Sequence, residues 1–137
     1  MNNSVRRILR SIGAVLAGLV AIFVLSLGTD AGLHAIGYFP PWGQPVADVP
    51  LLWATLYRTA YAVLGSYLAA RLAPSRPMRH ALALGTVGLL LSTAGAVATW
   101  DRGPEFGPHW YPLALIATAM PCAWAGGLLR NLQLRGR

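Results

Sequence analysis

Cysteine and charged residues are scarce in this sequence. Charged side chains make up 11% of its 137 residues, against roughly 25% in an ordinary soluble domain. Hydrophobic residues make up 55%, which leaves too little polar surface for a soluble fold. The lone cysteine, Cys122, excludes an internal disulfide, and no Cys-x-x-Cys pair exists for redox or zinc chemistry. We expect Cys122 to be a small apolar residue of a helix.

Lysine is absent and acids are few. The 11 basic residues are all arginine, and with 4 acids they give a formal net charge of +7. Such a balance often indicates nucleic-acid binding. Here, however, the arginines lie at the ends of apolar runs, and no basic stripe with stacking aromatics is present. Membrane topology and attraction to anionic headgroups explain them better, so we expect a lipid bilayer as partner and no nucleic acid.

The apolar residues lie in four long runs, at about residues 9–28, 51–72, 81–100 and 110–129. Each run is about as long as a bilayer is thick, roughly 20 residues. A helix satisfies its own backbone groups in lipid, and runs that do not alternate exclude a membrane β-barrel. The sequence therefore predicts an all-α integral membrane protein, in which residues 1–137 form a single membrane domain folded as a four-transmembrane-helix bundle.

Charges beside the runs predict the orientation. Except for Arg58 and Arg102, the arginines precede the first run, surround the second connection or follow the fourth run, and these regions contain no acid. The positive-inside rule then predicts a multi-pass protein of the bacterial inner membrane with both termini in the cytoplasm. A cleaved signal peptide with Arg6, Arg7 and Arg10 as its charged region is an alternative, although the first run is longer than the apolar region of such peptides.

Small residues at helical spacings predict close helix packing. They let helix backbones approach each other in lipid, where apolar burial gives no drive for association. One pair lies in the first run and four residues share a face of the third run. The predicted packing residues are Ala14, Gly18, Gly85, Gly88, Ser92 and Gly95.

The two halves of the chain share an order of features. Phe39 and Phe106 are each followed by proline two and six positions later, with a tryptophan between. This order is consistent with two tandem helical hairpins of the same topology. It is also consistent with the ordinary enrichment of tryptophan at membrane interfaces.

Arg58 is the most informative residue because it lies inside an apolar run. It stands thirteen residues before Arg71, which at about 1.5 Å per residue places it roughly 20 Å from the inner end of that helix. A charge at this depth is costly and usually faces a partner or a water-filled cavity. The stripe expected to face the bundle interior comprises Thr55, Arg58, Thr59, Ala62 and Ser66.

Asp30, at the outer end of the first run, is the expected partner of Arg58, and Asp101 is the second candidate. His34 follows Asp30 by four residues and shares its face if the first helix continues past Gly28. We predict one polar site under the outer loops. Its candidate residues are Asp30, His34, Arg58, Asp101 and His109.

Two plainer interpretations of this cluster stay open. The charged pair is then a structural contact that sets the order of the helices, or the Arg58 side chain extends to the outer interface. Trp53, Tyr57 and Tyr61 lie on another face of the second helix. We expect them to anchor or pack that helix rather than to bind a cofactor.

Several activities of small membrane proteins do not fit. Small multidrug exporters need a carboxylate in the first helix, and residues 12–27 contain none; the charge bias is stronger than is typical of small fluoride channels. A vitamin K epoxide reductase needs a cysteine pair, and an intramembrane serine protease needs a buried Ser–His pair. A b-type haem would require His34 and His109 to face each other. We predict no enzyme, no metal site and no cofactor.

The segments Gly28–His34, Phe39–Trp42 and Gly107–Pro112 resemble those of small bacterial inner-membrane proteins with four spans. The resemblance covers nearly the whole chain and implies topology but no activity. We therefore expect an accessory or scaffold protein, or a subunit of a complex, that packs against itself or another membrane protein through small-residue faces. The alternative is a small channel or carrier for a polar or anionic solute, with Arg58 as the counter-charge.

Overall fold

A computed structural model describes residues 2–137, and all the regular secondary structure in this part of the chain is helical, without strands. Four long helices account for most of it: α1 (Asn3–Ala35), α2 (Asp48–Leu72), α3 (Pro77–Thr99) and α4 (Trp110–Arg135). A short 3-10 helix, η1 (Pro104–Phe106), lies in the connection between α3 and α4. The prediction of an all-α fold with four helices is therefore confirmed.

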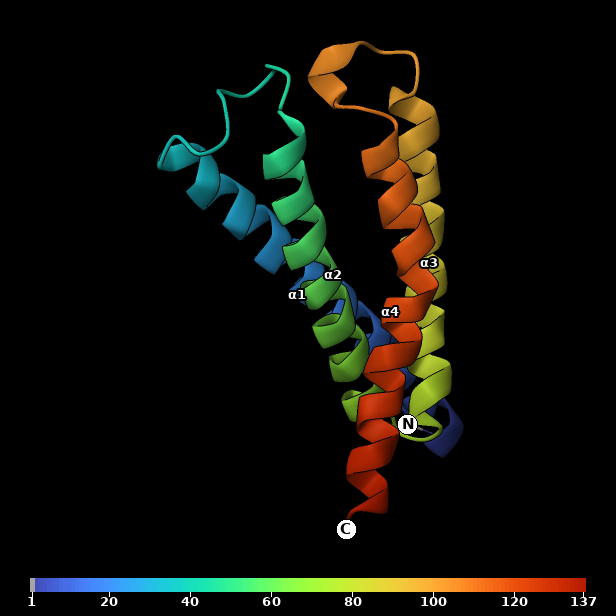
Figure 1. The fold of residues 1–137 in the computed structure, drawn as a ribbon. Coiled ribbons are helices and arrows are strands. Elements are labelled where there is room, and N and C mark those ends of the chain that lie inside the picture. The colour runs from blue at the N-terminus through green and yellow to red at the C-terminus, as the bar shows by residue number, and fades with distance from the viewer. Residues whose placement is uncertain (1) are drawn as a thin grey trace.

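The helices form a bundle with two different ends (Figure 1). Both chain termini and the connection 73–76 lie at one end, called here the terminal end, and the connections 36–47 and 100–109 lie at the other, called the loop end. Consecutive helices pack as antiparallel pairs, and α2 also packs along α4. Helix α1 crosses α2 obliquely, so that near the loop end it diverges from α3 and α4 (Figure 1).

The helix boundaries follow local chemistry. Asn2 caps α1, since its side-chain oxygen accepts a hydrogen bond from the Ser4 backbone N–H at 3.2 Å. Pro77 is the first residue of α3. A backbone N–H at this position has no partner within the helix, so proline, which lacks one, loses no hydrogen bond there. Helix α1 continues past Gly28 to Ala35, well beyond its apolar run. The end of the apolar run therefore does not mark the end of this helix.

Small residues bring the helix backbones together near the terminal end. A Cβ atom added to Gly126 of α4 would lie 2.6 Å from the carbonyl oxygen of Val63 in α2. Gly18 of α1 approaches the backbone of Gly65 in α2 in the same way. These distances leave room for no side chain, so glycine is required at these crossings. Gly65 is a packing residue that the sequence patterns did not single out.

The predicted packing residues behave in two ways. Ala14 and Gly18 are buried, and Gly85 faces Ala123 of α4. In contrast, no atom lies within 4 Å of a Cβ added to Gly88 or Gly95. The close approach expected along one face of α3 is thus present at Gly85 and absent at Gly88 and Gly95, because α1 diverges from α3 toward the loop end (Figure 1).

Large apolar side chains face outward along the bundle. On α1 alone, Ile12, Leu16 and Val20 are each more than half exposed. Three segments are long and apolar enough to cross a membrane: Asn3–Ala35, Pro77–Thr99 and Pro104–Arg135. Helix α2 falls short of that hydropathy because Arg58 and several tyrosines and threonines interrupt its apolar residues.

Candidate functional site

The extension of α1 beyond Gly28 brings Asp30 against α2. Arg58 Nη2 donates to Asp30 Oδ2 and forms a salt bridge with it, while the Tyr57 hydroxyl donates to Asp30 Oδ1. Each carboxylate oxygen thus has its own donor. Asp30 is 8% exposed, and the Arg58 side chain is 28% exposed. A buried acid with two donors is far less costly than an isolated charge.

The tyrosines of α2 contribute more than the sequence indicated. Tyr57 and Tyr61 both point toward α1, where the Tyr61 hydroxyl lies 2.8 Å from Thr29 Oγ1. The expectation that Tyr57 only anchors or packs the helix omits its hydrogen bond to Asp30. A signal was present, since a carboxylate with one arginine partner still has an oxygen to satisfy. Tyr57 is one of the two hydroxyl residues that flank this arginine, and the other, Thr59, donates to the Thr55 carbonyl oxygen.

An outer cavity of about 180 Å³ lies between this pair and the loops. His34 forms part of its wall, with its Nδ1 donating to the Asp30 carbonyl oxygen at 2.7 Å. The His34 ring stacks on Trp42, with centroids 3.5 Å apart, and meets Phe39 edge-on. The first loop therefore folds over the charged pair through aromatic contacts to His34.

A central cavity of about 160 Å³ lies on the other side of Arg58 and is lined by all four helices. Its wall includes Thr59 and Ser66 of the predicted α2 stripe. Ser26 Oγ and Arg58 Nε are buried and have no hydrogen-bond partner within residues 2–137. Such atoms are uncommon in native proteins and call for an explanation. Arg58 lines both cavities and therefore lies between them.

Asp101 and His109 do not join this cluster. They line a separate surface hollow beside Trp100. The His109 ring stacks on Trp100 with centroids 3.7 Å apart, and its Nε2 donates to the Trp100 carbonyl oxygen at 2.8 Å. Because α3 ends at Thr99 and the loop folds back on its last turn, Asp101 is left exposed. The expected convergence of five residues is thus reduced to Asp30, His34 and Arg58.

Glu105 and Tyr111 take the places expected for Asp101 and His109. Both line the outer cavity together with Asp30 and Arg58. Glu105 belongs to η1 and Tyr111 to the first turn of α4. No spacing in the sequence singles them out, because their position depends on the fold of the 100–109 loop.

Within residues 2–137, no three His, Cys, Asp or Glu side chains are grouped as metal ligands would be. His34 and His109 line different cavities, each stacked on its own tryptophan. The arrangement therefore offers an ion pair between two cavities, of which the central one is lined mainly by apolar and small residues, with aromatic loop contacts on the outer side. The chain matches no protein-family model, no curated protein and no solved structure.

Proposed function

We propose that the chain is an integral membrane protein whose four helices all cross the bilayer. Three segments have the length and hydropathy for this, and the outward-facing apolar side chains would be poorly placed in water. Helix α2 is less apolar, but it packs against all three other helices. Its one interior charge, Arg58, is matched by Asp30, which lowers the cost of placing it in lipid.

The proposed location is the bacterial inner membrane, with both termini in the cytoplasm. Nine of the arginines lie near the terminal end of the bundle, and all four acids lie near the loop end. The positive-inside rule orients the terminal end toward the cytoplasm.

Cysteine labelling tests this topology. In a variant that lacks Cys122, cysteines at Ala47 and Gly103 should react with an impermeant reagent in intact cells. Cysteines at Ser75 and Gln133 should react only after lysis. Reaction of the Ser75 position from outside would overturn the proposed topology.

Within the membrane, the role that the geometry supports best is that of an accessory or scaffold protein that receives a transmembrane helix of a second chain. The observation that carries this role is the open space beside the small residues of α3. Gly95 is exposed, Gly88 lies two helical turns before it on α3, and no atom lies within 4 Å of a Cβ added to either residue. Small residues with open space beside them accept a close helix backbone.

Two leucine substitutions on α3 test this role. Gly88→Leu fills open space, so it should leave the chain folded but abolish co-purification or crosslinking of the second chain from Ser92. Gly85→Leu is the matched control, because Gly85 already contacts Ala123, and it should disrupt the chain itself. If Gly88→Leu retains its partner, the scaffold role is wrong. Mass spectrometry of the crosslinked product distinguishes a second copy from another protein.

The second candidate is a carrier or channel for a polar or anionic solute. Arg58 favours it, because this residue lies between two cavities and keeps a free Nε donor. An anion entering the outer cavity would then compete with Asp30 for the guanidinium. Joint replacement by Asp30→Asn and Arg58→Leu separates the roles, since a scaffold should still bind its partner, whereas transport should be lost.

A further inference from the structure

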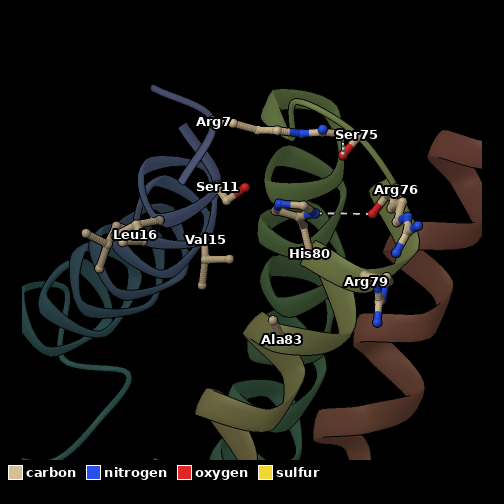
Figure 2. Close-up of a pocket in the computed structure, with 10 residues that line it drawn as sticks. Arg7, Ser11, Val15, Leu16, Ser75, Arg76, Arg79, His80 and Ala83 are labelled. Atoms are coloured by element: carbon tan, nitrogen blue, oxygen red, sulfur yellow. Dashed lines mark hydrogen bonds between the residues drawn. The ribbon is translucent and has the colours of Figure 1, made fainter. Parts of the chain in front are cut away.

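A groove at the terminal end lies between α1 and the start of α3 (Figure 2). Its volume is about 710 Å³, the largest among the cavities described here. We propose that this groove binds an anionic phospholipid, with the phosphate against its arginines and one acyl chain along its apolar wall. This inference rests on the proposed membrane insertion, which places the groove at the cytoplasmic leaflet.

Three arginines from two distant segments form the rim of the groove. Arg7 comes from α1, and Arg76 and Arg79 come from the second connection and the start of α3. Arg7 Nη2 donates to Ser75 Oγ at 2.9 Å, which holds the Arg7 side chain across the mouth of the groove (Figure 2). No acid lines the groove in the part of the chain that the structure describes. Several cations without a carboxylate between them favour an anionic ligand.

The backbone at Arg76 supports a role for its side chain. Arg76 has φ +48° and is the one non-glycine residue of the described chain with positive φ. Glycine or asparagine would adopt this conformation at lower cost. Strained non-glycine residues of this kind gather at ligand sites, where the structure around them maintains the strain. The strained backbone and the place of Arg76 in the groove wall therefore both support a role for its side chain in the proposed site.

Ser11 and His80 also line the groove, and its remaining wall is apolar and runs along α1 away from the arginines (Figure 2). Ile12, Leu16 and Ala83 line it, and the first two are each about half exposed. A free phosphate ion would use only the rim. A lipid uses both parts, because its phosphate meets the arginines while an acyl chain covers the apolar wall.

Native mass spectrometry with defined lipids tests the proposal. The purified protein is mixed with phosphatidylglycerol and phosphatidylcholine of identical chains, and bound lipid is counted. The wild type should retain phosphatidylglycerol preferentially. Arg76→Gln with Arg79→Gln should weaken that binding by roughly fivefold per arginine. Arg135→Gln with Arg137→Gln removes the same charge at the same end, outside the groove, and should leave the preference unchanged.

A third variant separates the groove from general surface charge. Leu16→Trp fills the apolar wall and keeps every arginine, so it should also reduce retention of phosphatidylglycerol. Equal losses in the two arginine pairs would overturn the site, and so would full retention in Leu16→Trp. Displacement of the lipid by soluble glycerol phosphate at millimolar concentration would show a phosphate site rather than a lipid site. If cysteine labelling confirms the proposed topology but the protein shows no preference for phosphatidylglycerol, the lipid site is wrong while the proposed membrane insertion stands.

Discussion

The terminal end and the loop end of the bundle are stabilised in different ways. Toward the terminal end, backbones meet directly, as at Gly126, where a Cβ would lie 2.6 Å from the Val63 carbonyl oxygen. At the loop end, α1 diverges from α3 and α4 (Figure 1), and polar side chains link it to α2. Helix packing at the terminal end thus depends on glycines, which have no side chain. At the loop end, the contact between α1 and α2 depends on a few specific polar side chains.

The two ends should therefore differ in the kind of substitution that destabilises them. The close backbone contacts at the terminal end leave no room for an added side-chain atom. They do not, however, require any particular functional group. The loop end contains the Arg58–Asp30 pair and both cavities beside it. At the loop end, the loss of one hydrogen-bonding group should lower the stability of the protein more than the addition of a methyl group does. Substitutions of each kind at each end therefore test the comparison.

The largest effect is expected from breaking the ion pair. Asp30→Asn or Arg58→Leu leaves the other charge unmatched, and each should lower the free energy of unfolding by about 3 kcal/mol. This is the low end of the range for buried pairs, because the Arg58 side chain is 28% exposed. The double variant should recover part of the loss. Unfolding in mixed detergent–SDS micelles measures all three, and strictly additive effects would show that the two residues do not interact.

A methyl group at the terminal end should come next in magnitude. Gly126→Ala should destabilise the protein by about 1–3 kcal/mol, because the new Cβ meets the α2 backbone, which can yield only by moving the helix. Gly95→Ala is the matched control at the loop end. Its Cβ would meet no atom within 4 Å, and helix propensity favours alanine by up to about 1 kcal/mol. The same unfolding measurement applies, and a stable Gly126→Ala protein would contradict the proposed difference between the two ends.

The sequence predicts the helices better than it predicts the site. Hydrophobic runs mark all four helices because a long run of apolar residues is a local property of the sequence. The placement of Asp30 opposite Arg58 follows from depth and charge, both of which can be counted along the chain. The roles of Tyr57 and Glu105 do not follow. They depend on the angle at which α1 crosses α2 and on the path of one loop, and no spacing encodes either.

A smaller effect is expected from a single hydroxyl. Tyr57→Phe removes one of the two donors to Asp30 and should cost about 1.5 kcal/mol, the low end for a hydrogen bond to a charged group. Tyr67→Phe is the control toward the terminal end, where the Tyr67 hydroxyl donates to Gln133 at 2.8 Å on an exposed surface. That bond should contribute less, because water replaces it. If both variants lose the same stability, the buried carboxylate does not depend on Tyr57.

The smallest effect is expected at Asp101, and it bears directly on how the loop end is organised. Asp101 is exposed in a hollow of its own, away from the outer cavity that Asp30, Glu105 and Arg58 line. Asp101→Asn should therefore change the free energy of unfolding by less than about 0.5 kcal/mol. Combined with Arg58→Leu, it should be additive, since distant residues without shared partners rarely couple. Coupling between these two positions, measured in the same micelles as the Asp30 cycle, would mean that Asp101 competes for Arg58 and that the loop end has one polar site rather than two.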